Sequence, residues 1–246
     1  MNLKQIFKSW LHPLVWERLG QAKQEYYWNK QIWHCDKALI SIFERYLSYS
    51  SGYYVDVGAN DGRSSSNTYH LERYQDWTGV LIEPIMHTFF RSKQIRSLQK
   101  NIFFNCACVG PDFIDNNIEL LYSGLMTILS SKTVEFDPIS WAESGEQFLA
   151  RGETVQKTWS TARTLDSILS EANSPNKIDL LSIDVEGSEL GVLQGINFSK
   201  FLFKYILIET KIESASHKRL LDLEYKLVER IQQNLLFAHR STLEMD

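Results

Sequence analysis

Four carboxylate side chains stand at or near the ends of apolar runs, where a ligand could reach them. Within or directly after YYVDV, GVLI, LLSI and YILI come Asp56, Glu83, Asp184 and Glu209, respectively. If these runs are strands of one open parallel sheet, their carboxyl ends line a shared ligand-binding crevice. Carboxylates crowded into a crevice repel one another unless the ligand supplies positive charge or hydroxyl donors. One such acid could instead cap the next helix, but four together favour a ligand site.

The glycine spacing in the turn GANDG narrows the kind of ligand. Gly58 and Gly62 permit a tight turn from strand to helix and close approach of a ligand to the backbone. The dinucleotide fingerprint needs a glycine where this chain has Asn60, and a phosphate-binding loop would need Gly-Lys-Ser/Thr. The turn is better suited to a ligand with an ammonium, a carboxylate and a ribose. Glu83, which ends the second run, is placed to accept both ribose hydroxyls.

Apolar periodicity predicts that strands and helices alternate along the chain. Strands are expected at residues 53–57, 79–82, 102–108, 178–183, 205–208, 225–231 and 235–239, and helices at 37–49, 64–73, 89–98, 165–172, 189–194 and 217–223. This alternation is typical of an α/β fold, with a parallel sheet and helices on both faces. The last two strands are separated by only three residues, which predicts a hairpin and an antiparallel edge.

Two segments depart from the alternation. Residues 111–160 form a long connection, interpreted as an insertion beside the site, in which Trp141 and Trp159 are either substrate walls or part of a decoration. Residues 1–50 are interpreted as a helical, aromatic-rich N-terminal extension, in which Pro13 leaves two short helical pieces at best. The main domain is then expected over residues 51–246.

The composition limits the classes of protein. The chain has 246 residues, of which 43% are apolar and 23% charged, as in soluble globular proteins. Its net charge of −4 gives no broad basic face for nucleic acid. No run approaches the roughly 20 apolar residues of a membrane span, and the first residues lack a signal-peptide core, so a cytoplasmic location is expected. Cys35, Cys106 and Cys108 are too few for a disulfide framework, and the last two are interpreted as buried, inert thiols rather than a metal pair.

Five segments between about residues 53 and 239 resemble the FkbM-type methyltransferases, which use S-adenosylmethionine. They are VDVGANDG, GVLIEP, the TLD of RTLDSIL, IDLLSIDVEGSELGVLQGINF and YKLVERIQQNLLF. The resemblance implies a Rossmann-like class I methyltransferase fold and O-methylation of a sugar, a glycan or another small hydroxylated metabolite. A non-catalytic cofactor-binding module is the alternative. A nicotinamide-dependent oxidoreductase is a second alternative. The absence of a glycine at position 60, which the dinucleotide fingerprint requires, counts against it.

The resemblance also implies roles for individual residues. The cofactor-binding set is Asp56, Gly58, Ala59, Asn60, Asp61, Gly62, Glu83, Pro84, Asn105, Cys106, Ala107 and Asp184, with Glu83 at the ribose and residues 105–107 near the adenine. Asp184, Glu186 and Gly187 match the segment beside the transferred methyl group. Asp184 is the first candidate for the base that accepts the acceptor's proton, and Glu186 is the second. A Mg²⁺ ion held by Asp184 and Glu209 is a weaker alternative.

Overall fold

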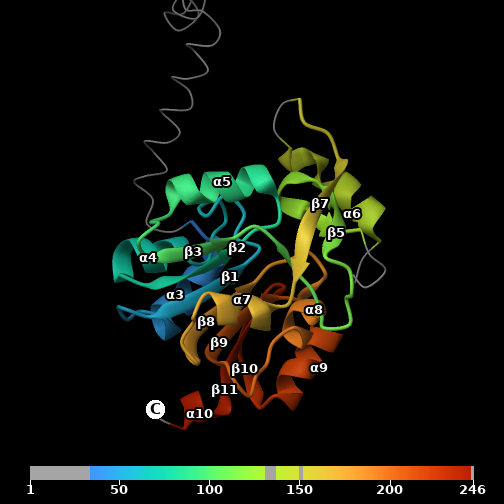
Figure 1. The fold of residues 1–246 in the computed structure, drawn as a ribbon. Helices are drawn as coiled ribbons and strands as arrows, with labels where there is room; N and C mark the ends of the chain where they lie inside the picture. Colours follow the sequence, from blue (N-terminus) through green and yellow to red (C-terminus); the bar gives the residue numbers. More distant parts are fainter. Residues whose placement is uncertain (1–33, 131–136, 150–151, 245–246) are drawn as a thin grey trace, which may run out of the picture.

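The structure, a computed structural model, describes residues 34–130, 137–149 and 152–244. Its largest element is a seven-stranded sheet in the order β10-β11-β9-β8-β1-β2-β3 (Figure 1). Neighbouring strands are parallel except around β11, which is antiparallel to both β9 and β10. The strands are β1 (Tyr53–Val57), β2 (Thr78–Ile82), β3 (Asn101–Phe104), β8 (Lys177–Ile183), β9 (Leu202–Glu209), β10 (Tyr225–Ile231) and β11 (Asn234–His239). The predicted Rossmann-like α/β fold and the antiparallel C-terminal hairpin are both confirmed.

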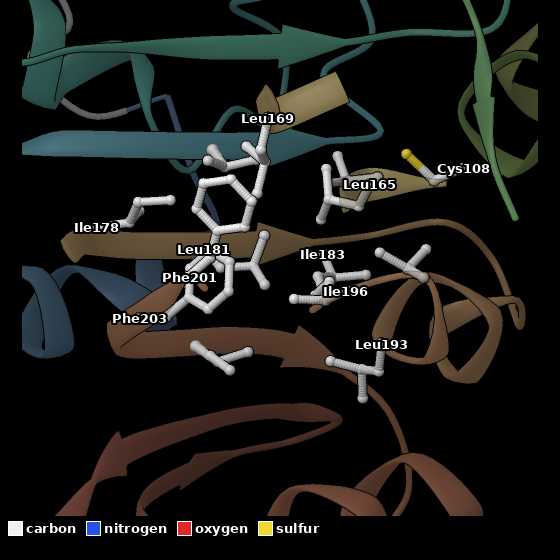
Figure 2. Packing of buried hydrophobic residues seen from close by; sticks show 14 of the residues in the cluster. Cys108, Leu165, Leu169, Ile178, Leu181, Ile183, Leu193, Ile196, Phe201 and Phe203 are labelled. Carbon is white, nitrogen blue, oxygen red and sulfur yellow. The ribbon is translucent and has the colours of Figure 1, made fainter. Parts of the chain in front are cut away.

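Apolar side chains alternate along the central strands and build one hydrophobic core on each face of this sheet. In β8, for example, Leu181 and Ile183 join one core, whereas Leu180 joins the other. Figure 2 shows Leu165 and Leu169 of one helix lying close to the β8 side chains in the first core. That core is covered by α7 (Leu165–Glu171), α8 (Glu189–Gln194) and α9 (Ala215–Asp222). The period of two therefore positions helices on both faces of the sheet.

The second core is covered by helices from the N-terminal part of the described chain. Leu39, Ile42 and Phe43 pack there with Tyr54 of β1 and Leu207 of β9. The helices are η1 (Lys37–Leu39), α3 (Ile40–Tyr46) and α4 (Tyr69–Gln75), and α10 (Arg240–Leu243) adds Leu243 at the edge. The helix predicted over residues 37–49 is thus present and packs on the sheet. The predicted helical pieces around Pro13 lie outside the described residues, and the predicted domain boundary at residue 50 stays a prediction.

Several predicted elements differ from the structure in their bounds; the helix expected over residues 89–98, for example, is α5 (Met86–Ile95). The helix expected from residue 64 begins at Tyr69, since Asp61 accepts the backbone N–H groups of Arg63 and Ser64, and Ser66 accepts that of Tyr69. Such side-chain bonds favour turns over helices. The strand expected over residues 102–108 divides at Asn105 into β3 and β4 (Ala107–Cys108), which belong to different sheets.

The long connection folds into a lobe beside the main sheet (Figure 1). Its four-stranded sheet has the order β4-β7-β5-β6. The elements are β5 (Asn117–Tyr122), η2 (Gly124–Met126), β6 (Ile128–Leu129), α6 (Pro138–Ser144), η3 (Gly145–Phe148) and β7 (Gln156–Arg163). Because Ala107 pairs with Ala162, β4 ties this lobe directly to the end of β3.

The order of the strands reverses at β1, which lies between β2 and β8. The chain runs outward through β2 and β3 and then returns to the other side of β1. At such a switch point the loops after neighbouring strands leave in opposite directions and open a crevice. Here the crevice lies beyond Val57 of β1 and Ile183 of β8, and α5 (Met86–Ile95) and the lobe stand beside it (Figure 1).

Candidate functional site

The turn after β1 is held against β8 at a position that only glycine fits. Gly58 has φ +88°, and a Cβ built there would lie 1.9 Å from the carbonyl oxygen of Asp184. The backbone N–H groups of Gly58 and Ala59 both donate to Ile82 O at 3.0 Å. The turn is therefore fixed between β2 and β8, with its backbone facing the crevice.

Glu83 is the carboxylate at the end of β2, and both of its oxygens accept hydrogen bonds. Oε2 accepts the backbone N–H of Asn60 at 2.8 Å, and Oε1 accepts the N–H of Ile85 at 2.7 Å and the Thr88 hydroxyl at 3.0 Å. Burial raises the pKa of Glu83 to about 7, although these donors oppose the shift. The side chain is thus locked in place while its oxygens keep lone pairs for a ligand's hydroxyls.

Asp56 lies on β1 and is buried, and Thr68 donates its hydroxyl to Asp56 Oδ2 at 2.5 Å. Burial also raises the pKa of Asp56. Behind Thr68 stands the fully enclosed guanidinium of Arg96, which donates to Thr68 Oγ1 at 3.1 Å and to Gly62 O at 2.9 Å. Its charge is compensated by an ion pair with Glu72. This buried network stabilises the glycine turn through the hydrogen bond from Arg96 to Gly62 O.

A cavity opens where these elements meet, with about 650 Å³ of empty space including its mouth. One side is formed by the ends of β1, β2 and β8 together with Cys106, Ala107 and Cys108, and the other by Leu120, Leu125, Thr127 and Leu129 of the lobe. Burial raises the pKa of the Cys106 thiol to about 12, so this wall is uncharged near neutral pH.

Asp184 and Glu186 form the acidic end of the cavity. Asp184 is exposed and lines the cavity, and the neighbouring protein atoms partly desolvate its carboxyl. This desolvation, with the negative charges of Glu209, Glu189 and Asp56, raises the pKa of Asp184 to about 7. Desolvation and the Asp184 charge raise the pKa of Glu186 to about 9, and Trp141 Nε1 donates to its Oε2 at 3.1 Å.

The backbone that carries these acids is unusual. Glu186 has φ +54° and Gly187 has φ +95°, so two successive residues lie in the left-handed region. Such a conformation is rare for a residue with a side chain and is often found at functional sites. It turns the chain sharply between β8 and α8. Asp184 and Glu186 thereby reach the same cavity from either side of Val185, which also lines it.

The predicted site residues divide by position. Those that line the cavity are Gly58, Asn60, Glu83, Pro84, Cys106, Ala107, Asp184 and Glu186. Asp56 and Ala59 line an adjoining hollow, which also contacts Gly58, Asn60, residues 64–67 and Asp184. Asp61, Gly62 and Asn105 are not among the residues that line the cavity, and their contacts are with the surrounding protein. Asp61 accepts turn N–H groups, Gly62 faces Arg96, and Asn105 Nδ2 donates to Glu83 O and Pro84 O at 2.8 and 3.0 Å.

The sequence prediction missed several residues of the site. Thr88 positions Glu83, and five lobe residues line the cavity. No local pattern marks them, and only the length of the 111–160 connection indicated that this segment belongs near the site. Of the two tryptophans interpreted as possible substrate walls, Trp141 contacts Glu186, whereas Trp159 is 65% exposed and does not line the cavity.

Two broader features concern the described residues alone. Among residues 34–130, 137–149 and 152–244, no group of three or more His, Cys, Asp or Glu side chains is arranged to hold a metal ion. Asp184 and Glu209 do line one small hollow together, so the Mg²⁺ alternative stays a prediction. Over the same residues, no helix is both long and apolar enough to span a bilayer.

Residues 56–230 match the model of the Methyltransferase FkbM domain family. No curated protein has significant sequence similarity to this chain. The crystal structure of Methyltransferase FkbM from Methylobacillus flagellatus KT is 18% identical with a TM-score of 0.46, over 82% of this chain and 47% of that one. This chain therefore spans about half the length of that protein. A TehB-like SAM-dependent methyltransferase from Corynebacterium glutamicum is 9% identical with a TM-score of 0.41, over 93% of this chain and 100% of that one.

Proposed function

Because this chain belongs to the FkbM methyltransferase family, we propose that it methylates a hydroxyl oxygen of a sugar, a glycan or another small metabolite. The family and the Rossmann-like fold support a methyltransferase that uses S-adenosylmethionine. The observation that carries the choice of a hydroxyl acceptor is the Asp184 carboxyl. It is accessible in the cavity and has a pKa of about 7, which suits a general base near neutral pH.

The residues that line the cavity support S-adenosylmethionine as the cofactor. Glu83 would accept the two ribose hydroxyls, and the uncharged wall of Cys106, Ala107 and Cys108 would face the adenine. The glycine turn and the hollow near Asp56 would hold the amino-acid end, whose ammonium the buried carboxylates would attract. When bound, the cofactor supplies a methyl group that its sulfonium has already activated.

Asp184 and Glu186 would then have different tasks. At pH 7 about half of the Asp184 carboxyls are ionised, so Asp184 would accept the proton from the acceptor hydroxyl at a side-chain oxygen. Glu186, with a pKa of about 9, stays protonated at that pH. It would donate a hydrogen bond and orient the acceptor while Trp141 holds its other oxygen. The lobe would exclude water, and holding both reactants in register would contribute up to about 7–11 kcal/mol to the barrier reduction.

The test compares Asp184→Asn with wild type in transfer of a labelled methyl group to a panel of sugars, glycans and hydroxylated metabolites. We expect the variant to bind S-adenosylhomocysteine normally and to transfer methyl about 10²–10⁴-fold more slowly, since it lacks the base. Asp222→Asn, which changes an exposed aspartate at the end of α9, is the matched control and should keep full activity. Undiminished turnover in Asp184→Asn would remove this residue from catalysis, and exclusive labelling of amines would reject the hydroxyl acceptor.

A further inference from the structure

Thr68 directly precedes helix α4, yet its hydroxyl is not used to cap that helix. It occupies the N-cap position, where a threonine oxygen usually accepts a backbone N–H of the first turn. Within the described part of the chain its hydroxyl accepts none of them, and Ser66 Oγ accepts the N–H of Tyr69 at 3.1 Å. Thr68 is fully buried, and its hydroxyl lies between Asp56 and Arg96. This hydroxyl therefore serves the site side of the turn and not the helix.

The hydrogen bonds around this hydroxyl run in one direction. Arg96 Nη1 donates to Thr68 Oγ1 at 3.1 Å, and a guanidinium can only donate. Thr68 has a single hydroxyl hydrogen, and because Oγ1 lies 2.5 Å from Asp56 Oδ2, that hydrogen points to the carboxylate. Each hydrogen bond in such a series polarises the next, so the positive charge of Arg96 strengthens Thr68 as a donor. The series thus links a buried cation to a buried carboxylate.

Asp56 lines the hollow beside the glycine turn and has one carboxylate oxygen left for a ligand. Among the described residues, Thr68 alone donates a hydrogen bond to Asp56, and it binds Oδ2. Burial raises the pKa of Asp56, whereas the Thr68 hydrogen bond and the Arg96 charge oppose that shift. Both neighbours therefore favour the ionised carboxylate that a positively charged group of a ligand needs.

We propose that Thr68 is a positioning residue for the cofactor, which holds Asp56 Oδ2 so that Oδ1 binds the ammonium group of S-adenosylmethionine. The inference rests on the proposed function, because it needs the amino-acid end of that cofactor in the hollow. Thr68 is not among the residues that line the cavity or the hollow, so it acts through Asp56 and not by contact with the cofactor. Without the hydroxyl, the Asp56 carboxylate loses its donor in a buried setting, where lost hydrogen bonds are costly.

The test measures the affinity of full-length Thr68→Val for two ligands by calorimetry. One is S-adenosylhomocysteine, and the other is its deamino analogue, in which hydrogen replaces the amino group. Valine keeps the branched shape of threonine but has no hydroxyl. We expect S-adenosylhomocysteine to bind the variant at least about tenfold more weakly than wild type, since a hydrogen bond to a charged group is lost. The deamino analogue should bind both proteins with equal affinity, because it has no ammonium for Asp56.

Two further variants separate positioning from folding. Thr68→Ser keeps the hydroxyl and should restore the wild-type affinity for S-adenosylhomocysteine. Thr242→Val is the matched control, because Thr242 is also a buried threonine but lies on α10, after strand β11. It should leave both affinities unchanged. Thermal unfolding followed by circular dichroism checks that each variant is folded, and if Thr68→Val is not, Thr68→Ala removes the same hydroxyl and is judged by the same comparison.

Three results would overturn the inference. They are an unchanged affinity of Thr68→Val for S-adenosylhomocysteine, an equal loss of affinity for both ligands, and a Thr68→Ser variant as weak as Thr68→Val. An equal loss for both ligands would mean that Thr68 only supports the shape of the turn. If wild type did not bind S-adenosylhomocysteine at all, the proposed function itself would fail, which distinguishes that failure from the other three.

Discussion

Replacing Glu209 with glutamine should lower the pKa of Asp184, because the two carboxylates end neighbouring strands. The register pairs Ile183 of β8 with Ile208 of β9, so Asp184 and Glu209 are the next residues on adjacent strands. Strands lie about 4.8 Å apart. Two charges about 7 Å apart interact by about 2 kcal/mol at an effective dielectric constant of about 20. Glu209 is exposed and solvent screens it, so we expect the pKa of Asp184 to fall by about one unit from its value of about 7.

The assay is a carbon-13 NMR titration of ligand-free protein with labelled aspartate carboxyls, in which Asp184→Asn identifies the signal. Glu213→Gln is the matched control, since Glu213 is exposed and lies beyond the end of β9. It should leave the Asp184 titration unchanged. A wild-type Asp184 that titrates near 4 would refute the argument from burial. A midpoint near 7 that Glu209→Gln leaves unchanged would refute the contribution of the neighbouring charge.

This titration has a consequence for activity. With a pKa of about 7, the ionised fraction of Asp184 rises from about 9% at pH 6 to about 91% at pH 8. The rate of transfer at low substrate concentration should therefore rise about tenfold over this range if Asp184 acts as the base. The rise should disappear in Asp184→Asn. A transfer rate that does not change with pH in wild type would show that ionisation of Asp184 does not limit methyl transfer.

Three further predictions follow from the same contacts. Gly58→Ala places a Cβ 1.9 Å from Asp184 O at φ +88°. In a denaturant titration it should reduce the free energy of unfolding by about 3 kcal/mol or more. Gly152→Ala is the control, because its φ is +92° but no atom lies within 4 Å, and it should lose only about 1 kcal/mol. Glu83→Gln should weaken S-adenosylhomocysteine binding by about 100-fold or more in calorimetry, because the amide nitrogen cannot accept the N–H of Asn60 or Ile85; Glu44→Gln on the exposed side of α3 should leave the affinity unchanged. Glu186 keeps its proton up to about pH 9 in the folded state, whereas the unfolded chain releases it near pH 4.5, so the free energy of unfolding falls as pH rises through this range. Glu186→Gln should therefore stabilise the protein by about 2 kcal/mol or more at pH 8 and much less at pH 5, and equal stabilisation at both pH values would contradict the assigned pKa.

Much of the main sheet could be predicted because its signals are local. Alternation of residues such as Leu180 and Leu181 between two cores leaves a period of two in the sequence. The short connection between β10 and β11 predicted the hairpin. The carboxylates were found for the same reason, since each follows an apolar run. The parallel topology brings Glu83 and Asp184 to the cavity, whereas Asp56 and Glu209 line two other hollows that Asp184 also lines.

The parts that could not be predicted depend on contacts between distant residues. The pairing of Ala107 with Ala162 divides a run that looks like one strand and creates the lobe sheet. The start of α4 depends on which backbone groups Asp61 and Ser66 capture. The difference in pKa between Asp184 and Glu186 comes from burial and from charges on neighbouring elements, so the sequence could name both acids but not assign their tasks.

The most direct test of the central claim is a crystal structure of this chain with S-adenosylhomocysteine. The account predicts that the ribose hydroxyls lie on the Glu83 carboxylate, the adenine lies beside Cys106–Cys108, and the sulfur lies near Asp184. A ligand bound elsewhere, or bound in the cavity with its ribose turned away from Glu83, would contradict it.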